Sequence, residues 1–207
     1  MALSAITELK IGKIGIWELT ESVSSLTLLY NPAEKEKNEL KKLNNKKKKK
    51  EYLAIRLLLK YILPENNEIV YNEKRKPYLK NKKLNISISH SKDLAVLMIS
   101  NKNIGIDVEP ASRQVDKVAS RVLNDRELAD SSTDSLKQLL YWCAKEAAFK
   151  TVPGENINFK NNIEINPFIL EPTGGLFFGR FLKNSSCKNL SFTYFFHKNN
   201  IIVYCVI

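Results

Sequence analysis

The stretch "LKQLLYWCAKEAAFK", residues 136–150, decides the fold of the second half of the chain. Its apolar and small side chains recur at the 3.6-residue period of a helix and form one stripe. The members of that stripe are Leu136, Leu139, Leu140, Cys143, Ala144 and Ala147. Trp142, Glu146 and Lys150 follow one another at i, i+4 and i+8 along one edge of the stripe. A Glu and Lys pair at this spacing is also a common surface pair, worth about 0.2–0.5 kcal/mol, so the helix alone does not establish a site.

A second stretch, "IGIDVE" at residues 104–109, places two carboxylates on one side of a predicted strand. Its apolar residues point to one face, and Asp107 and Glu109 point to the other. Two residues along a strand span roughly 6.5–7 Å, so both carboxylates can reach one ion. Gly105 leaves that face open beside them, so that a ligand or a second segment of the chain can approach closely. Hard oxygen ligands favour Mg²⁺, although a strand with an acidic solvent-facing side produces the same pattern.

The order of the remaining elements predicts an α+β fold made of two halves, residues 1–102 and 103–207. Residues 11–30 have strand-like patterning, and Asn31 and Pro32 are suited to begin a helix. A second helix is expected over "EYLAIRLLLKYIL" (51–63), and "LAVLMIS" (94–100) and "IGIDVE" are expected to pair as a hairpin. Short strands are expected after the helix at 136–150. No sequence repeat relates the two halves.

Composition limits the class of protein. No run approaches the roughly 20 apolar residues of a membrane helix, and the N-terminus lacks the pattern of a secretory signal. The three cysteines are odd in number and contain no CxxC pair, which favours a reduced cytoplasm. The net charge of +11 favours an acidic partner.

Together the two motifs closely resemble the signature of the phosphopantetheinyl transferases of the surfactin-synthetase-activating type, related to holo-acyl-carrier-protein synthase. That signature is a G-hydrophobic-D-x-E strand followed by a W-x-x-K-E-x-x-x-K helix. Further segments resemble the family in the same order, from about residue 31 to 150: "EYLAIRLLLKYIL" (51–63), "RKPYL" (75–79), "NISISHS" (85–91) and "RVLNDRE" (121–127). Residues 151–207 agree only in general character.

The resemblance implies a fold and a reaction. The fold would consist of two similar α/β halves with pseudo-twofold symmetry. Each half would be a small, mainly antiparallel sheet packed with a long helix, with the site at the interface between the halves. The reaction would be the Mg²⁺-dependent transfer of phosphopantetheine from coenzyme A to a serine of an apo acyl or peptidyl carrier protein, with Mn²⁺ as an alternative ion. Adenosine 3′,5′-bisphosphate would be released. We expect a cytoplasmic monomer, acting in processes such as fatty acid biosynthesis, with no nucleic-acid or membrane partner.

The resemblance also implies residue roles at the matching positions. Asp107, Glu109 and Glu146 would hold the metal, and Glu127 would help to deprotonate the incoming serine, with Glu146 and Lys150 also counted as catalytic. The residues expected to contact coenzyme A are Arg56, Lys76, Pro77, Ser89, His90, Lys145 and Lys150. Lys150 would meet the pyrophosphate, and Lys145 would lie near it. One departure is Arg75, which stands where the family often has a glycine before its K-P segment.

Two other classes of function fit parts of the sequence. The charge and the lysine run Lys46–Lys50 suit a nucleic-acid-binding module, but aromatic residues are not interleaved with that run as a base-stacking surface requires. A metal-dependent nuclease or phosphatase would share the carboxylates but use water as its nucleophile. An acidic carrier protein suits the same basic excess, and the lysine run is predicted to dock it.

Overall fold

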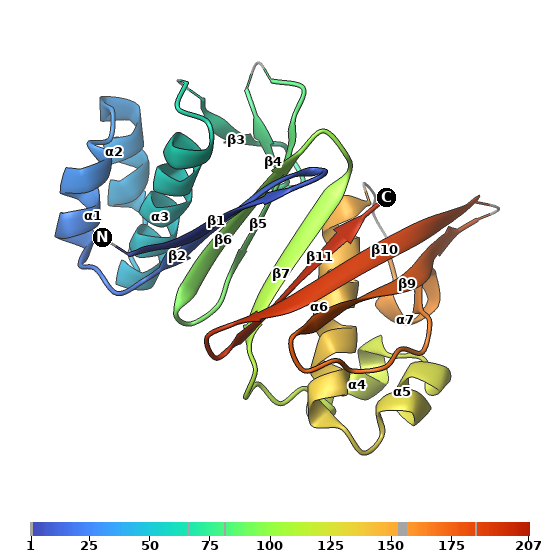
Figure 1. Ribbon diagram of the computed structural model, residues 1–207. Coiled ribbons are helices and arrows are strands. Elements are labelled where there is room, and N and C mark those ends of the chain that lie inside the picture. The colour runs from blue at the N-terminus through green and yellow to red at the C-terminus, as the bar shows by residue number, and fades with distance from the viewer. Residues whose placement is uncertain (1, 66, 81, 153–156, 185) are drawn as a thin grey trace. The chain divides into compact units, whose positions relative to one another are not determined.

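A computed structural model describes residues 2–65, 67–80, 82–152, 157–184 and 186–207 of the chain. Within these ranges the protein is α+β, with three small antiparallel sheets and seven helices. The chain divides into two compact units, Met1–Asn101 and Lys102–Ile207 (Figure 1). No helix in the described residues is both long and apolar enough to cross a membrane.

The first unit has a four-stranded antiparallel sheet in the order β1-β2-β6-β5 and a separate two-stranded hairpin, β3-β4. Its strands are β1 (Leu3–Leu9), β2 (Gly12–Glu18), β3 (Ile69–Tyr71), β4 (Pro77–Leu79), β5 (Asn85–His90) and β6 (Leu94–Ser100). Strands β2 and β6 pair in one unbroken register, from Gly12 opposite Ser100 to Glu18 opposite Leu94. This central pair is the platform on which the longest helix of the unit packs.

Three helices belong to the first unit: α1 (Val23–Tyr30), α2 (Glu34–Lys42) and α3 (Lys46–Ile62). Helix α3 packs on β2 and β6 and buries one apolar face, which includes Leu53, Leu57 and Leu58. Burying each such side chain contributes roughly 1.5–3 kcal/mol. Asn45 caps the helix by accepting a hydrogen bond from the Lys47 amide at 2.7 Å, so the lysine run forms the first turns of α3.

The second unit has a five-stranded antiparallel sheet in the order β7-β11-β10-β9-β8. Its strands are β7 (Ile104–Pro110), β8 (Ile163–Ile165), β9 (Gly174–Lys183), β10 (Ser186–His197) and β11 (Asn200–Val206). Its helices are α4 (Asp116–Val122), α5 (Asp125–Ser131), α6 (Ser135–Thr151) and α7 (Phe159–Asn162). Helix α6 packs on β7 and β11. The predicted stripe from Leu139 to Ala147 is fully buried, and Leu136 packs at its margin, which confirms the predicted helix and its core face.

Three local expectations from the sequence were wrong. Residues 23–30 form helix α1 rather than strand, because Ser22 caps it through the Ser25 amide at 3.0 Å. Asn31 ends this helix in the left-handed conformation (φ 51°) instead of starting the next one, which begins at Glu34. Strands β6 and β7 do not form a hairpin, since β6 pairs with β2 and β5 while β7 pairs with β11. Turn residues at 101–103 suit a linker between units as well as a hairpin.

Candidate functional site

The centre of the second unit is the contact between strand β7 and helix α6. Gly105 makes this contact close, because a Cβ at that position would collide with the carbonyl oxygen of Ala147. The close approach brings Lys150 onto the strand. Its Nζ donates to Oδ1 of Asp107 at 2.9 Å and to the Ile106 carbonyl at 2.7 Å. Asp107 is only 5 % exposed, so this charge pairing stabilises a carboxylate that water reaches poorly.

Glu109 and Glu146 complete an acidic cluster with Asp107. Burial, and then the charge of Asp107, raise the pKa of Glu146, with a smaller contribution from Glu109. Glu109 pairs with Arg113, whose guanidinium also lies 5.3 Å from the ring centroid of Trp142. The structure therefore brings the three predicted carboxylates into electrostatic contact, with two cations among them.

Arg113 was not predicted as a site residue. It lies four residues after Glu109, in the turn that follows β7, and none of the motifs in the sequence includes it. The ion pair shows that an exposed basic residue beyond the motif offsets one of the three negative charges of the cluster. Because Glu109 lies on a strand and Arg113 in the segment that follows it, the i,i+4 rule for helices does not apply, and no signal in the sequence points to this pair.

The carboxylates can be tested as a set of ligands for a cation. Among the described residues, no group of three or more His, Cys, Asp or Glu side chains is arranged to hold a metal ion. Asp107 is turned to Lys150, and Glu109 is turned to Arg113. The donor chemistry nevertheless fits Mg²⁺, which commonly binds one or two carboxylates and fills its other positions with phosphate oxygens and water. A hard cation would also offset the like-charge contact that raises the pKa of Glu146.

Lys145 and Glu127 occupy a different environment from the acidic cluster. Their side chains are 0 % and 1 % exposed, and Lys145 Nζ lies 2.7 Å from Glu127 Oε2. Lys145 also donates to the carbonyls of Phe159 (2.9 Å) and Ile163 (2.6 Å). Glu127 accepts from the Ile165 amide at 2.9 Å. Helix α6, the start of α5 and the α7–β8 segment are thus held together by one buried, hydrogen-bonded pair.

The burial of this pair bears on the roles expected for its members. A base for the incoming serine, or a cation that contacts pyrophosphate, must reach the substrate, whereas both groups here are enclosed by protein. Glu127 also closes a capping box at the start of α5 by accepting from the Asn124 amide at 2.8 Å. Burial lowers the pKa of Lys145, and the charge of Glu127 opposes that shift. In this structure the pair positions α5, α6 and β8, and the two expected roles remain predictions.

Arg56, expected to contact coenzyme A, is buried in the first unit. Its guanidinium lies 3.4 Å from Glu36 and 3.6 Å from Glu39, and it stacks 3.2 Å from the ring centroid of Tyr52. Tyr30 donates to Glu36 at 2.5 Å. Two carboxylates of α2 allow the charge of this arginine to be buried. The network holds α1, α2 and α3 together.

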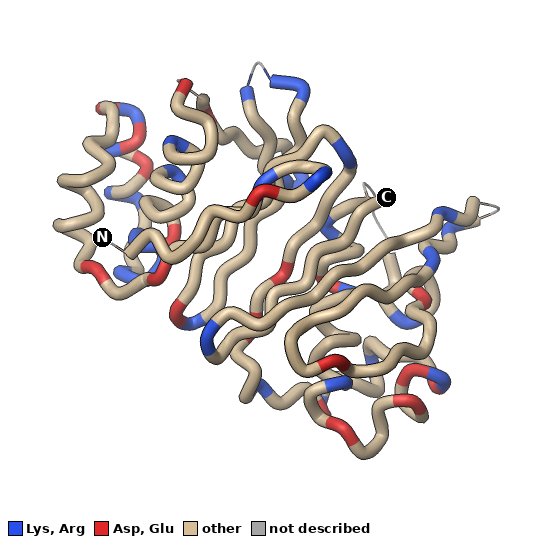
Figure 2. The backbone as a smooth tube through the Cα atoms, in the orientation of Figure 1, with Lys and Arg blue, Asp and Glu red and all other residues tan. Residues whose placement is uncertain are grey.

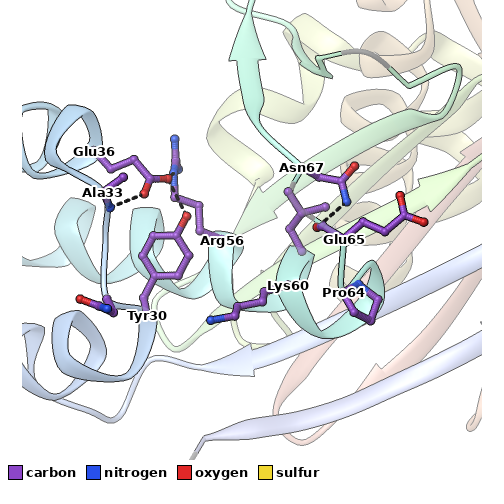
Figure 3. Close-up of a pocket in the computed structure, with 10 residues that line it drawn as sticks. Tyr30, Ala33, Glu36, Arg56, Lys60, Pro64, Glu65 and Asn67 are labelled. Carbon is purple, nitrogen blue, oxygen red and sulfur yellow. Dashed lines mark hydrogen bonds and ion pairs between the residues drawn. The ribbon is translucent and has the colours of Figure 1, made fainter.

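A pocket of about 280 Å³ lies beside this network, as Figure 3 shows. The α1–α2 junction forms one wall, and the second half of α3 with the segment after it forms the other. The residues labelled in the figure are Tyr30, Ala33, Glu36, Arg56, Lys60, Pro64, Glu65 and Asn67. Lys60 is exposed at this pocket. Because Glu36 and Glu39 already offset Arg56, Lys60 is the lining residue best placed to meet an anion.

Lys76 and Pro77 line a second pocket of the first unit, about 310 Å³ in volume, with the start of β5. Lys76 is half-buried, and burial lowers its pKa. The preceding residue, Arg75, has φ 60°, the left-handed conformation that glycine adopts most easily. This explains how the chain passes through a turn where the family often has glycine. Farther along β5, Ser89 is buried and His90 is half-buried.

The comparisons agree with this geometry. The second unit forms an α+β domain with a carboxylate pair on strand β7, and the helix packed on this strand carries Glu146 and Lys150. Residues 103–204 match the family described as the 4′-phosphopantetheinyl transferase superfamily, over just under half of the 207-residue chain. The match supports a transferase of the phosphopantetheinyl type and does not distinguish the surfactin-activating subtype. A search of curated proteins found no match.

Proposed function

We propose that the protein transfers phosphopantetheine from coenzyme A to a serine of an apo acyl or peptidyl carrier protein, and that the reaction depends on Mg²⁺. The observation that carries this proposal is the cluster of Asp107, Glu109 and Glu146 with Lys150, inside the region that matches the transferase superfamily. Such a cluster combines ligands for a hard cation with a cation suited to phosphate.

The proposed chemistry breaks the pyrophosphate bond of coenzyme A as the serine oxygen attacks phosphorus. Adenosine 3′,5′-bisphosphate leaves, and the serine proton is released. Negative charge grows on the phosphate oxygens during this step, and a bound Mg²⁺ would supply charge stabilisation. Asp107, Glu109 and Glu146 would hold the ion. We propose that Lys150 then turns part of its hydrogen bonding from Asp107 to a phosphate oxygen.

The proposed recognition of coenzyme A uses the first unit. Lys76 and Pro77 line one pocket, and Lys60 is exposed at the other. We propose that Lys76, Pro77, Ser89 and His90 contact the nucleotide, as the family resemblance implies. Arg56 would act there through the network that shapes the α1–α2 wall, since its charge is already offset by Glu36 and Glu39.

A metal-dependent phosphohydrolase would use the same carboxylates. No observation favours it over the transferase, whereas the superfamily match favours transfer. The two differ in the nucleophile and so in the product. Release of inorganic phosphate or cleavage of coenzyme A without any carrier would indicate hydrolysis.

Intact-mass spectrometry tests the proposal directly. An apo acyl carrier protein would be incubated with the full chain, coenzyme A and Mg²⁺, beside a sample containing EDTA. We expect the carrier to gain the mass of one phosphopantetheine group, and we expect EDTA to abolish the gain. Coenzyme A binding without any gain across several fatty-acid, polyketide and peptide carriers would reject the assignment.

A further inference from the structure

The positive charge of the chain is concentrated in the first unit. Residues 1–101 contain 20 Lys and Arg against 11 Asp and Glu, a net charge of +9, while residues 102–207 contain 13 against 11, a net charge of +2. Seven lysines fall within residues 41–50 with no acidic residue among them. Figure 2 shows this gathering on α2 and at the start of α3. We name it the lysine ridge, comprising Lys41, Lys42 and Lys46–Lys50.

The ridge is poorly neutralised by its own protein. Lys47 lies 3.7 Å from Glu51, and Lys50 donates to the Leu19 carbonyl at 3.2 Å. Within the ranges that the structure describes, no ion pair involves Lys41, Lys42, Lys46 or Lys48, all of which are exposed. The cause lies partly in α2, whose Glu36 and Glu39 are turned to Arg56. These two carboxylates of α2 are therefore used to stabilise a buried arginine.

The ridge is also unfavourable for the fold that carries it. Five lysines occupy the first turns of α3, where the positive end of the helix dipole and their mutual repulsion both disfavour cations. No acidic residue lies in the first turn of this helix. The lysine ridge thus lowers the stability of the fold and leaves most of its positive charge without an acidic partner in the described residues. Such a surface is suited to an anionic partner.

The helix beside α3 adds an apolar feature. Helix α1 packs against α3, and its Leu28 and Leu29 are 85 % and 40 % exposed. A partner that presents acidic and apolar side chains together would use both features, whereas a phosphate backbone would use only the charge. Helical carrier proteins are such partners. We propose that the lysine ridge is the surface that docks the acidic carrier protein. This proposal rests on the proposed function, because the carrier protein is the protein substrate of that reaction.

The test uses a charge-reversal variant of the full chain, Lys46→Glu, Lys47→Glu and Lys48→Glu together. The control is Lys10→Glu, Lys83→Glu and Lys92→Glu, three exposed lysines of the same unit that lie outside the ridge and change the net charge equally. Because acidic residues suit the first turn of a helix, the ridge variant should unfold at or above the wild-type temperature. Lost docking then cannot be ascribed to a damaged fold.

Two measurements are made with an acidic apo acyl carrier protein: fluorescence anisotropy of binding, and the KM for carrier and for coenzyme A in the transfer assay. We expect the three substitutions in the ridge to weaken carrier binding and to raise the KM for the carrier by about tenfold or more. The KM for coenzyme A should stay within about twofold of the wild-type value. The control triple should change both values less than threefold. Added salt should weaken binding to wild type more than to the ridge variant.

The two proposals can fail separately. Transfer by wild type with equal carrier KM values in the two triple variants would overturn the docking surface but keep the function. Ridge-dependent carrier binding without transfer would keep the surface and reject the function. If anionic vesicles or duplex DNA bind in a ridge-dependent way while carrier binding does not change, the ridge serves a lipid surface or nucleic acid and the proposal is wrong.

A second variant tests the apolar feature beside the ridge. Leu28→Ser should weaken carrier binding severalfold, whereas the control Ile169→Ser, which also replaces an exposed apolar side chain, should leave carrier binding unchanged.

Discussion

Strand β2, inside its sheet, and strand β7, at the edge of its sheet, have matching neighbours in their respective units but carry different chemistry. Each precedes the helices of its unit and pairs antiparallel with the last strand of that unit, β6 or β11. Each has a glycine under the long helix: Gly15 meets Leu58 and Ile62 of α3, and Gly105 meets Ala147 of α6. Two residues after that glycine, β2 has Trp17 and β7 has Asp107.

The difference at this position separates packing from chemistry. Trp17 is fully buried in the core of the first unit, and its indole N–H donates to Glu21 at 3.0 Å. Asp107 needs Lys150 to offset its charge, and it raises the pKa of Glu146. One strand therefore contributes to stability, whereas the other places charges close together at a cost in stability, as is typical of a functional site. The predictions below test this division.

The largest expected effect concerns the buried cations of the two long helices. Lys145→Met should lower the free energy of unfolding by about 3–5 kcal/mol, because Glu127 would be left buried without its partner. Arg56→Met should cost less, since its partners Glu36 and Glu39 are 23 % and 42 % exposed and can be hydrated. Urea denaturation of both variants measures the difference.

A paired variant serves as the control for that prediction. Lys145→Met combined with Glu127→Leu removes both charges and should recover part of the loss, since the Ile165 and Asn124 amides still lose their acceptor. A double variant as unstable as Lys145→Met alone, or a larger loss for Arg56→Met, would contradict the description of a structural pair in the second unit.

The two glycines should respond differently to alanine. Gly105→Ala places a Cβ against the backbone of Ala147, so α6 must move, and we expect a loss of about 2–3 kcal/mol. Gly15→Ala meets only the ends of the flexible Leu58 and Ile62 side chains, each at 2.9 Å, and should cost about 1 kcal/mol or less. Equal losses in denaturation experiments would show that the two helix–strand contacts are equally close.

Glu146→Gln should raise the stability of the metal-free protein. Burial and the charge of Asp107 raise the pKa of Glu146 above 4.5 in the folded state. The protonated carboxyl of Glu146 therefore favours the folded state below pH 4.5, and this contribution to stability is lost as the pH rises through the pKa of the folded state. At neutral pH we expect Glu146→Gln to gain roughly 0.5–1 kcal/mol.

A pH series of unfolding curves tests this expectation. The advantage of Glu146→Gln over wild type should grow from pH 4.5 upward and then level off. Glu164→Gln is a suitable control, because Glu164 pairs with Arg180 at 3.0 Å and its replacement should bring no gain. Loss of stability in Glu146→Gln at neutral pH would show that the carboxylate is a structural partner rather than a strained site residue.

The smallest expected effect concerns turns. Arg75 and Lys198 adopt positive φ values of 60° and 52°, one in each unit. Replacing either with glycine should raise stability by about 0.5 kcal/mol, because the left-handed conformation strains residues with a Cβ. Thermal unfolding of Arg75→Gly and Lys198→Gly compares them. A destabilised Arg75→Gly would mean that its side chain holds the turn before Lys76.

The sequence was sufficient to predict the helices and strands whose structure follows from a single hydrophobic pattern. The 3.6-residue stripe of α6 and the alternation in β7 were sufficient for the α+β class, and the contact between Asp107 and Lys150 agrees with their motifs. Helix α1 was missed because it is only 8 residues long, its one fully buried residue is Leu26, and its start depends on a Ser22 cap. The burial of Lys145 could not be predicted, since it depends on carbonyls contributed by residues 159 and 163. Local sequence contains no information on such distant partners.

The measurement that tests the central claim most directly is transfer by wild type and Glu146→Gln side by side. An apo acyl carrier protein, coenzyme A and Mg²⁺ would be incubated with each protein, and the carrier mass would be followed over time. We expect wild type to add one phosphopantetheine group and Glu146→Gln to be slower by at least about a thousandfold while remaining folded. Equal rates would contradict the assignment of the β7–α6 carboxylates as the reactive centre.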